Sequence, residues 1–144
     1  MSDEIHDVLR TQELRLVDKS GRDCAVLSSG EKGSVSLSFL DSANKVRTKI
    51  GVGENGQAVF ELGHAGGASS FSIVVEQDGR VIIEGIDAEG VERFKLQLTG
   101  NGSHTELSFH EKYRKPRMLL MAEDKGPAGL FIMDTDGKAL FTTT

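Results

Sequence analysis

The sequence contains no tryptophan, one tyrosine, one cysteine and two prolines among its 144 residues. A lone Cys24 cannot form an intrachain disulfide, which argues against a disulfide-stapled secreted scaffold. No apolar run approaches the roughly 20 residues of a membrane helix, and the opening MSDEIHDVLRTQ lacks the apolar core of a signal peptide. The net charge of −5 gives no overall attraction to phosphate backbones or anionic lipids. We therefore expect a cytoplasmic protein, and we expect neither nucleic acid nor a membrane as its partner.

Glycine, in contrast, is abundant and regularly spaced. Gly33, Gly56, Gly79 and Gly102 are 23 residues apart, and Gly126 follows after 24. The residues that open a second kind of turn recur with the same spacing: Asp18, Asp41, His64, Asp87, Glu111 and Asp134. One residue inserted between Gly102 and Glu111 explains the longer step. Six copies of one unit of about 23 residues therefore tile residues 13–144 as a single domain, preceded by an N-terminal segment, 1–12, with a candidate edge strand.

Side chains alternate within each unit. Residues two and four positions before the turn-opening residue are mostly apolar, as are those seven and nine after it, and polar residues stand between them. A period of two with one apolar face is typical of half-buried antiparallel strands. The pattern predicts an all-β antiparallel meander of about twelve strands.

The two turns of a unit differ in composition. The first is Asp-x-x-Gly, in which the carboxylate binds backbone amides and glycine adopts the left-handed conformation. The second contains Asn55-Gly56, Asp78-Gly79 or Asn101-Gly102, which favour a two-residue hairpin turn. Each unit is thus predicted to be a β-hairpin.

An apolar sheet face must be covered. We expect the meander to curl or close into a barrel or a prism-like roll, which buries this face and removes free edges. A β-trefoil, which also has twelve strands in six hairpins, is the alternative.

The recurring aspartates raise the question of a metal site. Calcium needs six to eight converging oxygens, whereas each turn supplies one regular carboxylate and the series is interrupted by His64 and Glu111. We interpret the aspartates as turn formers and expect no metal, no cofactor and no catalytic residue set.

The fifth unit departs most from the pattern, in the stretch HEKYRKPR. Four cations within six residues, with the only tyrosine, form a candidate site for an acidic or anionic partner. His64 and His110 occupy related turns, so they join the candidate binding set. The set is His64, His110, Glu111, Lys112, Tyr113, Arg114, Lys115 and Arg117.

Four apolar residues of the last two units occupy positions that are polar in most other units: Leu119, Met121, Phe131 and Met133. An exposed apolar patch of this kind usually marks an interface. We therefore predict a homo-oligomer that associates through these residues.

The stretch LRLVDKSGRDCAVL, echoed in SLSFLDSANKVRTKI, resembles the tandem L-x-L-x-D-x-x-G-x-x-R-x-x-L repeats of uncharacterised bacterial proteins. Arg47, Arg93 and Arg117 match the arginine of that motif, whereas Cys24, Ser70 and Leu140 do not. The resemblance implies a β-hairpin repeat fold, and it carries no activity.

The leading hypothesis is a non-catalytic, oligomeric β-repeat protein that acts as a binding or structural module. One alternative is a small enzyme with a cleft between units three and five, which would use His64, His110 and Glu111. The other is a carbohydrate-binding β-trefoil.

Overall fold

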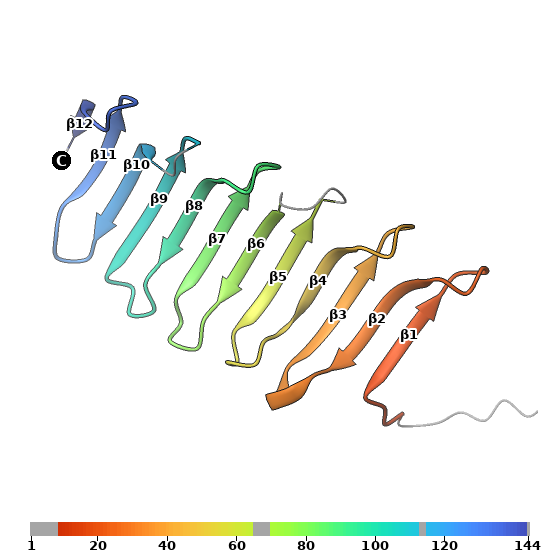
Figure 1. The fold of residues 1–144 in the computed structure, drawn as a ribbon. Helices are drawn as coiled ribbons and strands as arrows, with labels where there is room; N and C mark the ends of the chain where they lie inside the picture. The colour runs from red at the N-terminus through yellow and green to blue at the C-terminus, as the bar shows by residue number, and fades with distance from the viewer. Residues whose placement is uncertain (1–8, 65–69, 113–114, 144) are drawn as a thin grey trace, which may run out of the picture.

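The computed structural model describes residues 9–64, 70–112 and 115–143. Within these ranges the chain forms twelve antiparallel β-strands in one sheet, and the order of the strands in the sheet is their order in the chain (Figure 1). The predicted all-β meander is therefore confirmed.

The strands of the sheet are as follows: β1 (Glu13–Val17), β2 (Asp23–Ser29), β3 (Val35–Leu40), β4 (Val46–Val52), β5 (Ala58–Gly63), β6 (Ser70–Val75), β7 (Val81–Ile86), β8 (Glu92–Leu98), β9 (His104–His110), β10 (Pro116–Glu123), β11 (Ala128–Met133) and β12 (Ala139–Thr143). A short 3-10 turn, η1 (Glu31–Gly33), joins β2 to β3. Of the candidate N-terminal edge strand, residues 9–12 are not in a strand and the remainder lies outside the described residues.

The expected closure of the sheet is wrong, and so is the β-trefoil. The sheet is open, and β1 and β12 lie at its opposite ends (Figure 1). A barrel needs strands that are progressively staggered along the sheet. Here all strands span the same cross-strand rows, so that Leu14 of β1 and Thr143 of β12 end one straight row. The bulge that follows each Asp turn recurs at the same level and adds no net stagger.

Both turns of a unit close with similar hydrogen bonds. In the Asp turn the amide of Asp18 donates to the carbonyl of Arg22, and the amide of Gly21 donates back to Asp18. The Asn55-Gly56 turn repeats this arrangement between Gly53 and Gln57, with Gly56 at φ 75°. The prediction of a two-residue turn there is therefore wrong, because the glycine takes the left-handed position that closes a longer turn.

One face of the sheet is apolar along its whole length. Two cross-strand rows build it, and we call their side chains the apolar face. The first row is Leu14, Leu27, Leu37, Ile50, Phe60, Ile73, Ile83, Leu96, Leu107, Leu120, Leu130 and Thr143, and the second is Leu16, Ala25, Phe39, Thr48, Leu62, Phe71, Gly85, Phe94, Phe109, Met118, Ile132 and Phe141. Phe71, Phe94 and Phe109 stack along the second row, with ring centroids 6.2 Å and 6.4 Å apart.

The opposite face, which we call the polar face, contains a row that is charged in its middle. This row is Arg15, Val26, Ser38, Lys49, Glu61, Ser72, Glu84, Lys95, Ser108, Leu119, Phe131 and Thr142. Lys49 faces Glu61 and Glu84 faces Lys95, and such opposite charges stabilise neighbouring strands.

The sheet has almost no interior of its own. Among the described residues only Ala25, Ser72, Ser108 and Gly129 are buried. Ser72 and Ser108 are small residues that lie under the longer side chains of neighbouring strands, and the hydroxyl of Ser72 donates to Glu84 Oε1 at 3.3 Å. A single sheet layer cannot enclose a core, so the apolar face is uncovered in the described part of the chain.

Candidate functional site

The recurring aspartates hold the hairpin turns. In each of four turns the Oδ1 atom of the opening aspartate accepts hydrogen bonds from the backbone amides two and four residues later. These pairs are Asp18 with Ser20 and Arg22, Asp41 with Ala43 and Lys45, Asp87 with Glu89 and Val91, and Asp134 with Asp136 and Lys138. Across the described residues, no three His, Cys, Asp or Glu side chains are placed to hold a metal ion. The hydrogen bonds to the backbone amides make the aspartates stabilisers of the hairpin turns.

These hydrogen bonds favour the ionised carboxylates. The backbone amide of Arg22, aided by its guanidinium, lowers the pKa of Asp18 to about 2. The amide of Lys45 lowers the pKa of Asp41, and that of Val91 lowers the pKa of Asp87. Arg47 and Arg93 lower these two values further. Donation to a charged carboxylate is the common physical cause.

The arginines six residues after a turn-opening residue contact the turn of their own unit, and two of them also bind the next hairpin. Arg47 Nη1 lies 3.6 Å from Asp41 Oδ2, and Arg47 Nε donates to the carbonyl of Gly63 at 2.7 Å. Arg117 repeats this arrangement with Glu111 and with the carbonyl of Met133, at 3.5 Å and 2.8 Å. In the unit that has Cys24 at this position, Arg22 pairs with the aspartate instead. These contacts give a structural reason for the regular position of the arginines in the repeat.

The turn of the fifth unit has the same backbone closure, because the amide of Glu111 donates to the carbonyl of Lys115 at 3.0 Å. Its cations already have neighbours. Lys112 Nζ lies 3.0 Å from Glu89 Oε2, Lys115 Nζ donates to the carbonyl of Thr135 at 3.3 Å, and Arg117 pairs with Glu111. Tyr113 and Arg114 lie outside the described residues. Binding of an acidic or anionic partner at this turn stays a prediction.

His64 and His110 are not brought together. His64 follows β5 and His110 ends β9, so β6, β7 and β8 lie between them. Four strand spacings amount to about 19 Å, which is beyond the reach of catalytic partners. His110, whose side chain is 11% exposed, instead places Nδ1 3.2 Å from Glu92 Oε1, without the geometry of a hydrogen bond. The residues of the enzyme hypothesis therefore share no cleft.

The predicted interface residues form a small patch on the polar face. Leu119 faces Phe131 across β10 and β11, and Met121 faces Gly129 on the same strands. All four predicted residues, Leu119, Met121, Phe131 and Met133, are half-buried. A Cβ atom on Gly129 would meet the Phe131 ring at 2.9 Å, which shows how closely this ring covers the glycine.

The larger exposed apolar surface was not anticipated, because the sequence prediction places it inside a closed roll. Fourteen described residues on that side of the sheet are large and exposed: Leu14, Leu16, Leu27, Val35, Phe39, Ile50, Val52, Leu62, Val75, Leu98, Phe109, Leu120, Ile132 and Phe141. The signal was in the sequence. Each unit places apolar residues at the same alternate positions, which lie on this face, and in the described part of the chain no second layer covers them.

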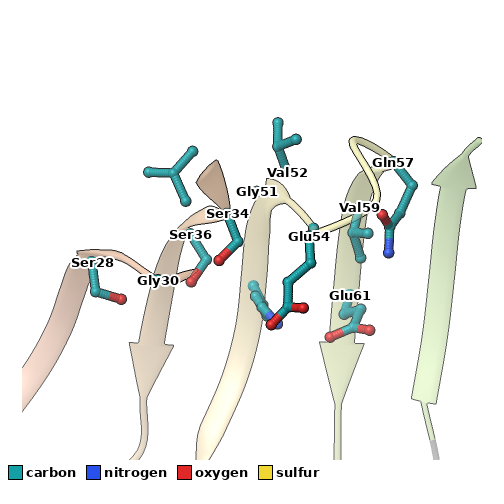
Figure 2. Close-up of a pocket in the computed structure, with 13 residues that line it drawn as sticks. Ser28, Gly30, Ser34, Ser36, Gly51, Val52, Glu54, Gln57, Val59 and Glu61 are labelled. Atoms are coloured by element: carbon teal, nitrogen blue, oxygen red, sulfur yellow. The ribbon is translucent and has the colours of Figure 1, made fainter. Parts of the chain in front are cut away.

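A hollow of about 400 Å³ lies where β2, β3, β4 and β5 pass Gly51 (Figure 2). A Cβ atom at Gly51 would lie 2.3 Å from the carbonyl oxygen of Val35, so the close approach of β3 requires glycine there. Serine hydroxyls line one side of the hollow, and Glu54 and Glu61 point into it from the other (Figure 2). Its lining also contains Lys49, so opposite charges meet in it and no single ligand chemistry is favoured.

No helix in the described ranges is long and apolar enough to span a membrane. No protein-family model matches the sequence, and a search of curated proteins finds no match.

Proposed function

We propose that this chain is a non-catalytic, oligomeric β-repeat protein that serves as a structural or binding module. The exposed apolar face carries the proposal. Its two rows contain 24 residues, and none of them is charged. Monomeric proteins seldom expose contiguous apolar patches of more than a few hundred Å².

The occupant of this face is the same face of another copy. The accessible surface of the chain is 10117 Å², whereas a compact monomer of 15.6 kDa exposes about 7,200 Å². The excess of about 2,900 Å² exceeds the ~800 Å² that each partner contributes to a standard interface. Two sheets packed ~10 Å apart would interleave their rows and leave both polar faces in water.

The remaining features suit such a module in the cytoplasm. Cys24 is a free thiol, which a reducing compartment preserves. The charged side chains lie on the polar face and in the turns, where they keep the assembly in solution.

The test is the mass of the full chain in solution at tens of micromolar, measured by analytical ultracentrifugation. We expect at least two copies. Leu27→Lys places a charge on the apolar face and should lower the number of copies in the particle. Val26→Lys introduces the same residue one position earlier, on the polar face, and should keep the wild-type mass. A wild-type monomer, or equal behaviour of the two variants, contradicts the proposal.

A further inference from the structure

Both edges of the sheet are open in the described part of the chain. Every residue of β1 and of β12 is exposed, and in the described part of the chain nothing pairs with their outer sides. β12 has the sequence ALFTT, with neither charge nor proline. Natural edge strands are usually blunted by charged residues, prolines or a covering segment, because free backbone groups invite pairing with another chain.

The strand directions allow such pairing. The sheet has an even number of strands and all neighbours are antiparallel, so β12 runs opposite to β1. A second copy placed beside β12 in the same orientation would therefore present its β1 as an antiparallel neighbour. Because the two edges lie at opposite ends of the open sheet (Figure 1), this contact joins the tail of one copy to the head of the next.

The internal junctions specify the register. At all five junctions between units, the residue seven positions after one turn-opening residue faces the residue two positions before the next. These pairs are Ala25 with Phe39, Thr48 with Leu62, Phe71 with Gly85, Phe94 with Phe109, and Met118 with Ile132. Applied to Asp134 of one copy and Asp18 of the next, the same rule pairs Phe141 with Leu16, Thr142 with Arg15 and Thr143 with Leu14.

We propose that β12 of one copy pairs with β1 of the next in this register, which joins copies head to tail into a continuous sheet. The pairing sets an aromatic ring opposite an aliphatic side chain on the apolar face, a favourable cross-strand combination. On the polar face it sets Thr142 against Arg15, with no like charges opposed. The contact is heterologous and repeats in a row, and it goes beyond the face-to-face packing proposed above because it uses only the edges.

Cysteine crosslinking of the full chain tests both the contact and its register. In a Cys24→Ser background, Arg15→Cys with Thr142→Cys places two Cα atoms at the distance of facing residues, ~4.5–5.5 Å, which a disulfide can bridge. Glu13→Cys with Thr142→Cys offers the same exposure on the same strands, but the two Cα atoms would be about 8 Å apart. All of these positions are exposed, so the variants should fold.

Under mild oxidation, the first pair should give covalent dimers and higher multiples on a non-reducing gel. The second pair, and each single-cysteine variant, should stay at background. Equal crosslinking of both pairs overturns the register. Background crosslinking of the first pair, with the wild-type mass in solution retained, overturns the edge contact while leaving the face-to-face proposal intact.

Discussion

Arg47 joins two hairpins, because its Nε donates a 2.7 Å hydrogen bond to the carbonyl of Gly63 at the end of the next unit's first strand. The same guanidinium lies 3.6 Å from Asp41, which closes the turn of its own unit. One side chain thus links a turn to the neighbouring hairpin. Arg117 does the same with Glu111 and Met133, whereas the Nε of Arg93 donates to Asp87 of its own turn.

Replacing Arg47 should therefore loosen a junction and leave the strand pattern unchanged. We expect Arg47→Ala to lower the free energy of unfolding by about 1 kcal/mol, because a charged hydrogen bond is lost at a partly exposed site. Arg47→Lys should recover little, since an ammonium cannot reproduce the two directed contacts of a guanidinium. Urea unfolding at fixed protein concentration measures both. Wild-type stability of the alanine variant would contradict this role.

The turn aspartates should make stability fall in acid. The pKa of Asp18 is about 2 in the folded chain, below its value of ~3.9 when unfolded. The unfolded chain therefore takes up the proton first, and the stabilisation, complete above about pH 4, is lost as the pH falls towards 2. The lowered pKa values of Asp41 and Asp87 act in the same direction.

The check is the urea midpoint as a function of pH for the wild type and for Asp18→Asn, which keeps an amide oxygen for the turn. The variant should show a smaller decrease in midpoint between pH 4 and pH 2. Identical curves would show that the Asp18 carboxylate is not responsible.

The sequence predicted the strands, their order and the aspartate turns, because these depend on side-chain alternation and local turn chemistry. Asp18 and its counterparts bind the expected backbone amides, and the rows of the sheet follow the 23-residue spacing. Closure was predicted wrongly because stagger and curvature accumulate over many strands, and no short pattern encodes them. The same error explains why His64 and His110 were expected to lie near each other. Only a closed sheet could bring their units together, and in the open sheet three strands separate them.

Gly85 in β7 should be difficult to replace, because the ring of Phe94 packs against it. A Cβ atom on Gly85 would lie 2.7 Å from Phe94 Cε1, so the ring lies directly over the glycine across β7 and β8. Gly85→Ala should therefore destabilise the chain by about 1–3 kcal/mol. Phe94→Leu removes the clash, so the double variant should lose less than the sum of the two single changes. Strict additivity in urea unfolding would contradict the contact.

Asn44 should be a weak point among the turns. It adopts φ 60° at the position where the other three aspartate-opened turns of this kind have glycine, namely Gly21, Gly90 and Gly137. A side chain in the left-handed region costs roughly 1–2 kcal/mol, less for asparagine. Asn44→Gly should therefore raise the free energy of unfolding by a few tenths of a kcal/mol, and Gly90→Ala should lower it by about 1 kcal/mol. Thermal unfolding of the two variants beside the wild type checks the opposite signs, and a shift of both in one direction would refute the shared turn geometry.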